Sequence, residues 1–141
     1  MAHVRESIAV SAPISDVFDL IADYRRALEW MEGFSHFDPL PGPTRGVGAR
    51  VRAAGTFLGF TIETELEIVE YEPPYRLVSR SAGPIKALTT WLISENETGT
   101  QVTFNGDYIL PLALRLAGDR AFEQVLASQI RRSLVNLQQL C

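Results

Sequence analysis

The chain has 141 residues, of which 46% are hydrophobic and 21% are charged, proportions typical of one soluble globular domain with its own core. The net charge of −4 disfavours nucleic acid as a partner, although twelve of the thirteen basic residues are arginine and four of these lie in the last helix. No apolar run approaches the roughly 18 residues of a membrane-spanning helix, and none at the N-terminus resembles a signal peptide. The one cysteine, Cys141, cannot form an intrachain disulfide, so we expect a cytoplasmic protein without membrane insertion.

The chain begins with a predicted strand and two short helices. Apolar and polar residues alternate over 4–10, which indicates a strand. Pro13 suits the first turn of a helix because its missing N–H would be unpaired there, and apolar residues recur at helical spacing over 13–22. A second short helix is expected at 24–31.

Six further strands are predicted in the middle of the chain. The clearest is 58–71, where Phe60, Ile62, Leu66 and Ile68 alternate with glutamates, the pattern of a sheet with one buried face. Turn-forming proline, glycine and asparagine separate the predicted strands, which indicates an antiparallel meander. The six strands are expected at 35–40, 47–54, 58–71, 75–82, 86–94 and 100–110.

The C-terminal run from 111 to 141 predicts one long amphipathic helix of roughly 28 residues, with Gly118 marking a kink or a break. Its apolar stripe needs a wide partner, and the predicted sheet is the only candidate. Strand, two helices, six strands and one helix give an α+β fold, which we expect to form a single domain over 1–141.

Several local patterns resemble those of one known superfamily. They are the opening Val10-Ser11-Ala12-Pro13 with Val17-Phe18, the turn Tyr71-Glu72-Pro73-Pro74-Tyr75-Arg76-Leu77-Val78, the hairpin Gly99-Thr100-Gln101-Val102-Thr103 and the closing Ser133-Leu134-Val135-Asn136-Leu137. In this order they resemble the START-like, helix-grip (SRPBCC) superfamily and its polyketide cyclase/dehydrase-type members, over nearly the whole chain. The resemblance implies a curved seven-stranded antiparallel sheet around the C-terminal helix and an apolar cavity between them. Members bind lipids, sterols, polyketides or plant hormones, act as cyclases or regulate chaperones, and the fold alone does not choose among these functions.

Alternation in the strands and the helical period predict which residues face the cavity. A cavity of ordinary ligand size, at least ~300 Å³, would cost about 7 kcal/mol if it stayed empty, so side chains, water or a ligand should fill it. Gly106 shares the inward face, where a glycine leaves room or marks a bend. Tyr24, Trp30 and Phe34 are expected to form a lid over the entrance. The full set of expected cavity residues is Tyr24, Trp30, Phe34, Phe60, Ile62, Thr64, Leu66, Leu77, Trp91, Phe104, Tyr108, Phe122, Leu126, Gln129 and Ile130.

The sequence carries little recognisable catalytic chemistry. No cluster of histidine and cysteine has metal-ligand spacing, so neither a metal nor another cofactor is expected. Glu63, Glu65 and Glu67 alternate with the apolar face and are expected to face solvent. The candidates for proton transfer or hydrogen bonding are Tyr108 and His36.

Three functions remain open at this point, in order of preference. The first is binding, and transport where the ligand is carried, of a small hydrophobic molecule. The second is a metal-independent cyclase/dehydratase acting on an aromatic or polyketide-like substrate. The third is a protein-interaction or regulatory module, which an apolar patch on the outer sheet face would favour. Monomer and homodimer are both compatible with the sequence.

Overall fold

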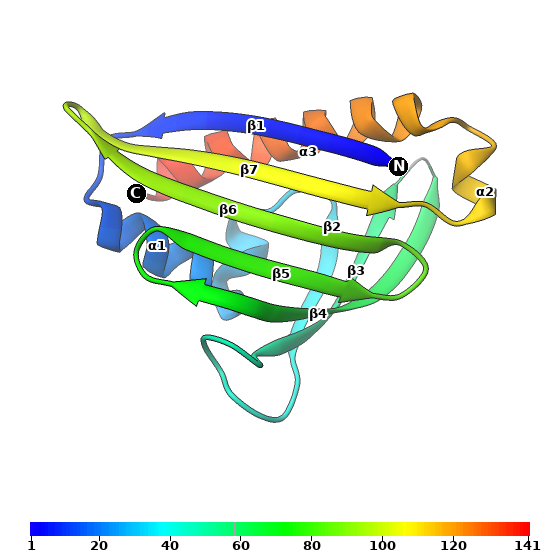
Figure 1. Ribbon diagram of the computed structural model, residues 1–141, viewed down its shortest axis with the longest axis horizontal. Helices are drawn as coiled ribbons and strands as arrows, with labels where there is room; N and C mark the ends of the chain where they lie inside the picture. Colours follow the sequence, from blue (N-terminus) through cyan, green and yellow to red (C-terminus); the bar gives the residue numbers. More distant parts are fainter. Residues whose placement is uncertain (58) are drawn as a thin grey trace.

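A computed structural model of the chain describes residues 1–57 and 59–141. Within them, seven strands form one antiparallel sheet in the order β1-β7-β6-β5-β4-β3-β2 (Figure 1). Consecutive strands from β2 to β7 are neighbours, which is the predicted meander, and β1 pairs with β7. The strands are β1 (Ala2–Val10), β2 (Phe34–Pro39), β3 (Arg50–Phe57), β4 (Phe60–Glu72), β5 (Arg76–Ala82), β6 (Lys86–Asn96) and β7 (Gly99–Ile109).

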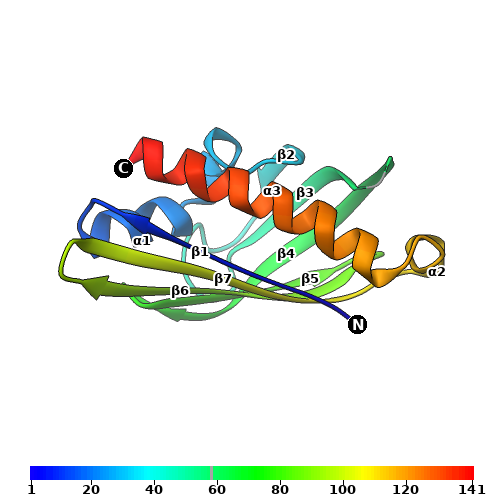
Figure 2. The same cartoon turned by 90° about the horizontal axis from the view of Figure 1, so that it is seen from above.

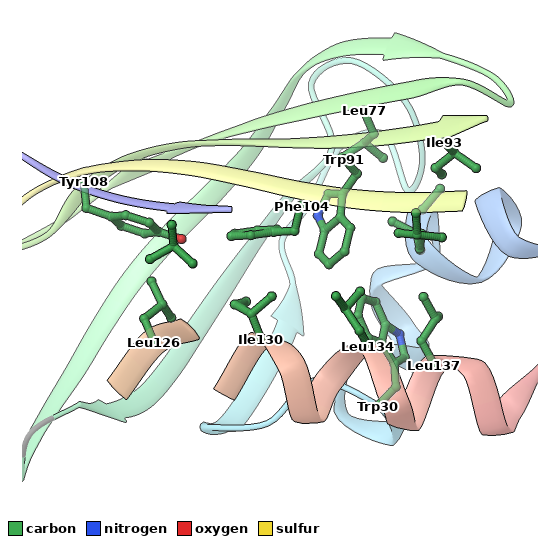
Figure 3. Packing of buried hydrophobic residues seen from close by; sticks show 14 of the residues in the cluster. Trp30, Leu77, Trp91, Ile93, Phe104, Tyr108, Leu126, Ile130, Leu134 and Leu137 are labelled. Carbon is green, nitrogen blue, oxygen red and sulfur yellow. The ribbon is translucent and has the colours of Figure 1, made fainter. Parts of the chain in front are cut away.

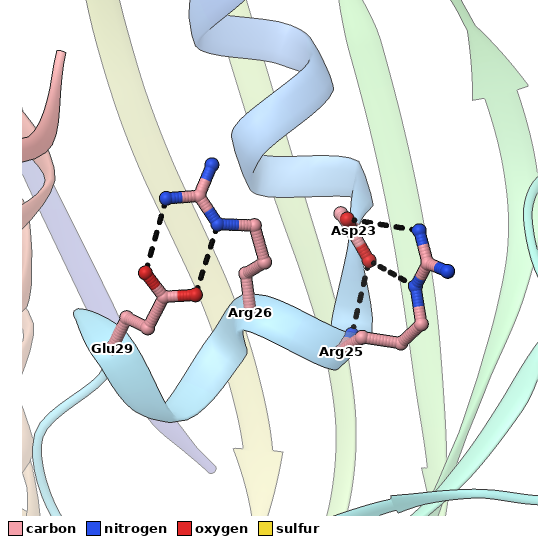
Figure 4. A network of polar contacts seen from close by, with 4 residues as sticks. All are labelled: Asp23, Arg25, Arg26 and Glu29. Atoms are coloured by element: carbon pink, nitrogen blue, oxygen red, sulfur yellow. Dashed lines mark hydrogen bonds and ion pairs between the residues drawn. The ribbon is translucent and has the colours of Figure 1, made fainter.

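Two short helices follow β1, as predicted. Helix α1 (Ile14–Ala22) begins after Pro13 and buries its apolar side. The 3-10 helix η1 (Tyr24–Glu29) begins after Asp23, whose carboxylate accepts hydrogen bonds from the backbone N–H and the guanidinium of Arg25. The bond from the Arg25 backbone satisfies an N–H group that would otherwise be free at the start of η1 (Figure 4). The Arg25 guanidinium also holds the pKa of Asp23 below its usual value.

The C-terminal run is two helices, so of the two alternatives predicted at Gly118, a kink or a break, the structure has the break. Helix α2 (Leu112–Arg115) is a single turn, and α3 (Asp119–Leu140) has 22 residues. They are separated at Gly118, whose φ of +94° is incompatible with a continuing helix. The break lets α3 return across the concave side of the sheet (Figure 2).

The sheet curls around α3. Figure 2 shows β1 beside one flank of the helix and β2 and β3 on the other. The buried stripe of α3 has the predicted spacing and includes Phe122, Leu126, Ile130, Leu134 and Leu137. This arrangement turns one face of the sheet inward over most of its length.

The strand boundaries differ from the prediction mainly at β3. The alternation that predicted a strand over 47–54 includes Val47, which is exposed, and the strand starts only at Arg50. Gly46 and Gly48 both have positive φ and keep this segment in a loop. Position 58, the first residue of the strand predicted over 58–71, lies outside the described residues.

Candidate ligand-binding cavity

A cavity of about 110 Å³ lies between the concave face of the sheet and α3. Its wall comes from the end of α1, from η1 and the residues after it, from the strands β2 to β7 with the turn between β5 and β6, and from α3 between Phe122 and Ile130. Among the described residues that line it, none is acidic, basic or histidine. The lining residues are Ile21, Tyr24, Trp30, Met31, Phe34, Phe37, Gly55, Phe57, Ile62, Thr64, Leu66, Ser79, Ser81, Ile85, Ala87, Thr89, Trp91, Phe104, Tyr108, Phe122, Leu126 and Ile130.

Aromatic side chains make the cavity smaller than the expected ~300 Å³. The rings of Trp30 and Trp91 lie 5.4 Å apart, and those of Trp91 and Phe104 lie 4.9 Å apart, both edge to face. Figure 3 shows these rings between the sheet and α3, with Leu134 and Leu137 packed beyond them. This part of the interior is therefore solid. The remaining volume, left empty, would cost about 2.6 kcal/mol at ~24 cal/mol per Å³, which a stable domain can tolerate.

The structure places twelve of the fifteen expected cavity residues on the cavity wall. Those from η1 and β2, which were expected to form a lid, belong to the same aromatic cluster, because Tyr24 packs edge-on against Phe37 at 5.1 Å. The twelve are Tyr24, Trp30, Phe34, Ile62, Thr64, Leu66, Trp91, Phe104, Tyr108, Phe122, Leu126 and Ile130.

Three expected residues lie elsewhere. Phe60 has the inward parity but stands at the start of β4, next to the β3–β4 turn, and is 45% exposed. Leu77 points inward but is packed in the solid part of the core. The Gln129 amide instead donates to the backbone oxygen of Thr56 on β3, at 3.3 Å, and lies against Gly33.

His36 does not line the cavity, so the structure does not bring this candidate for proton transfer to the site. A bulge in β2 lies between Phe34 and His36 and changes the alternation of the strand. Phe34 and Phe37 consequently both line the cavity, and His36 is exposed. Simple alternation could not reveal this shift.

The sequence prediction missed the serine and threonine residues of β5 and β6. Ser79 and Ser81 share the face of Leu77, and Thr89 shares that of Trp91, so the alternation of these strands could have identified them. The hydroxyl oxygens of Ser79 and Thr89 lie 2.6 Å apart. Ser81 is used locally, since it donates to the backbone oxygen of Ile85 and accepts from the N–H of Ala87.

Two tyrosine hydroxyls also belong to the wall. Burial raises the pKa of Tyr24 to about 12, an effect that the hydroxyl of Ser79 partly offsets. Burial, together with the neighbouring Asp107 carboxylate, raises the pKa of Tyr108 well above its ordinary value. Both phenols are therefore neutral near pH 7 and can donate a hydrogen bond.

Other features of the described residues bear on the kind of site. Over 1–57 and 59–141, no group of three or more histidine, cysteine or carboxylate side chains is placed to hold a metal ion. No described helix combines the length and the apolar character needed to cross a bilayer.

Comparison with known proteins identifies the family. Residues 1–141 match the family model described as polyketide cyclase / dehydrase and lipid transport. The chain belongs to this family. Membership in the polyketide cyclase / dehydrase and lipid transport family confirms the predicted superfamily and supports a ligand-binding or cyclase-like role.

Solved structures share the fold at low sequence identity. The protein TTHA0849 from Thermus thermophilus is 18% identical, with a TM-score of 0.84 over 97% of this chain and 94% of that one. A conserved protein from Geobacillus kaustophilus is 17% identical, with a TM-score of 0.79 over 98% and 93% of the two chains. The di-domain ARO/CYC BexL from the BE-7585A biosynthetic pathway is 20% identical, with a TM-score of 0.77 over 97% of this chain and 48% of that one. These likenesses confirm the α+β helix-grip fold. No curated protein matches the chain.

Proposed function

We propose that the protein binds a small, neutral, mostly apolar molecule in the cavity between the sheet and α3. The observation that carries this proposal is the composition of the wall, which is apolar and largely aromatic apart from neutral hydroxyls and the indole N–H of Trp30, which is unpaired among the described residues. An apolar pocket with a few placed polar groups is the usual form of a small-molecule site. A buried site without a charged partner disfavours an ionised ligand, because the desolvation of the charge would be uncompensated.

The cavity volume limits the size of the ligand. An apolar cavity of ~150 Å³ holds a benzene molecule, so the cavity of about 110 Å³ limits the ligand to a single small ring, for which the wall must widen. Phe57 and Phe122, whose rings pack 5.9 Å apart, belong to this wall.

Calorimetric titration with a matched pair of compounds tests the proposal. Benzyl alcohol should bind with one saturable site, and benzoate, of similar size but charged, should not bind detectably at pH 7. Binding of benzoate with equal affinity, or of neither compound, would contradict the proposal.

A cyclase-like enzyme is the second candidate, and Tyr108 is the observation in its favour. Its neutral hydroxyl lines the cavity and could donate to a substrate carbonyl whose oxygen becomes negative during ring closure. The cavity wall supplies no carboxylate or imidazole as a base among the described residues, and its volume is small for a polyketide chain. Both points place this function second.

Incubation with a short linear polyketone would test the enzyme. Cyclised product above the uncatalysed rate, lost in Tyr108→Phe and kept in His36→Ala, would favour catalysis over binding alone. Equal product formation by the wild type and Tyr108→Phe would rule out this role for Tyr108.

A further inference from the structure

Three positions form a row across the inner face of the sheet. Ser79 on β5 pairs with Thr89 on β6, and Thr89 pairs with Gly106 on β7. Paired residues of antiparallel strands point to the same face, so all three positions face the cavity side. Ser79 and Thr89 fill their positions with hydroxyls in contact, whereas Gly106 has no side chain to offer.

Tyr108 occupies the space that Gly106 leaves free. A Cβ atom on Gly106 would lie 2.6 Å from both the hydroxyl oxygen and Cε2 of Tyr108, so the phenol ring lies back over the glycine. The phenol oxygen therefore lies one strand away from Thr89, at the end of the row. Figure 3 shows the Tyr108 hydroxyl directed into the interior above Leu126. At the other end, Tyr24 and Ser79 both line the cavity.

The hydrogens of this row are not all used within the protein. The contact between Ser79 and Thr89 needs one hydrogen of the two hydroxyls. When Ser79 donates to Thr89, the hydrogen of Thr89 has no acceptor in the row. The Tyr108 hydroxyl makes no hydrogen bond to any described residue. Two hydroxyl donors, those of Thr89 and Tyr108, therefore lie beside Gly106.

We propose that Thr89 and Tyr108 form a two-donor site for the carbonyl oxygen of a neutral, single-ring ketone or aldehyde, and that Gly106 positions Tyr108 for it. A carbonyl oxygen has two lone pairs and can accept both hydrogens, whereas a hydrocarbon can accept neither. The apolar ring then lies against the aromatic wall. This inference rests on the proposed function, since it assigns the polar end of the same ligand.

Two probes of the same shape test the inference. Acetophenone carries the carbonyl, and α-methylstyrene replaces its oxygen with a CH₂ group. Trp30 and Trp91 both line the cavity, so their fluorescence reports the binding of either probe. Tyr108→Phe and Thr89→Val should each weaken acetophenone about tenfold, the loss of one buried hydrogen bond, and should leave α-methylstyrene within about twofold. Thr89→Ser, which keeps the hydroxyl, should restore the wild-type affinity for acetophenone.

The matched control lies on the opposite face of the sheet. Thr103→Val removes a cross-strand bond to Ser7 outside the cavity and should change neither affinity. Equal effects of Tyr108→Phe and Thr89→Val on the two probes would overturn the two-donor site while leaving the cavity as a binding site. Failure of both probes to bind the wild type would overturn the proposed function together with this inference.

Discussion

The sheet carries the same cross-strand pair on both of its faces. On the outer face, the hydroxyls of Ser7 and Thr103 lie 2.9 Å apart and are open to water. On the inner face, the hydroxyls of Ser79 and Thr89 lie 2.6 Å apart, and any unused hydrogen faces the cavity. Water satisfies the outer pair at no cost, whereas the inner pair needs a partner inside the protein or in a ligand. The two serine–threonine pairs therefore differ in burial, and only the buried pair can offer a hydrogen bond to a ligand.

The two faces also differ in charge. The outer face carries ion pairs such as Arg50 with Glu65 and Arg80 with Glu67. The alternation of glutamates with apolar residues predicted that these glutamates face solvent. It also exposes Leu88 and Leu92 of β6, the kind of residue that would favour an interaction module. The inner face presents no charge to the cavity among the described residues. Four predictions test this contrast.

The largest expected effect is that of removing an inner aromatic ring. Phe122 packs against both Phe57 and Tyr108, so Phe122→Ala should lower the free energy of unfolding by about 3–5 kcal/mol and enlarge the cavity. Val135 lies on the exposed side of the same helix and is 44% exposed, so Val135→Ala should change the free energy by less than about 0.5 kcal/mol. Denaturant unfolding of the two variants measures the difference, and similar losses would contradict the assignment of the inner face.

The same helix shows how far sequence reasoning reached. The 3.6-residue period correctly predicted the buried side of α3, because that side depends only on local geometry. The cavity volume could not be predicted in this way, since it depends on how rings from distant elements pack. The bulge beside His36 and the position of Tyr108 over Gly106 likewise depend on pairing between strands. The sequence pattern therefore predicted which face of each element points inward. Tertiary packing decides which side chains of that face can contact a ligand.

Gly106→Ala should have the next largest effect. The added methyl group would displace the Tyr108 ring, and forcing extra volume into a packed interior costs about 1–3 kcal/mol. The same substitution in a Tyr108→Ala background should cost less, because the clash is gone. Equal costs in both backgrounds, measured by denaturant unfolding, would show that the ring does not occupy this space.

Alkaline pH should reveal the two buried phenols. The folded state keeps protons on Tyr24 and Tyr108 at pH values where the unfolded chain, with tyrosine pKa values near 10, has lost them. The resulting stabilisation is complete below pH 10 and is lost as the pH rises towards 12, by up to about 1.4 kcal/mol per pH unit for each tyrosine. Thermal unfolding between pH 9 and about 11.5 should show a decline that is shallower in Tyr24→Phe. An unchanged slope in that variant would mean that Tyr24 does not titrate as a buried group.

The smallest effect is expected on the outer face. Arg50 and Glu65 lie 2.9 Å apart and are both exposed, so Arg50→Gln should cost about 0.2–1 kcal/mol at low salt. At ~1 M salt the difference from the wild type should disappear, since screening then acts within about 3 Å. A large loss of stability that persists at high salt would contradict the assignment of this pair to a solvent-screened outer face.

The indole N–H signals of Trp30 and Trp91 give the most direct test of the cavity as a binding site. They are the two tryptophans of the chain, and both line the cavity. Titration of ¹⁵N-labelled protein with a neutral single-ring compound such as acetophenone should shift both signals in parallel and to saturation. Signals that stay fixed, or that drift linearly without saturating, would contradict a ligand site between the sheet and α3.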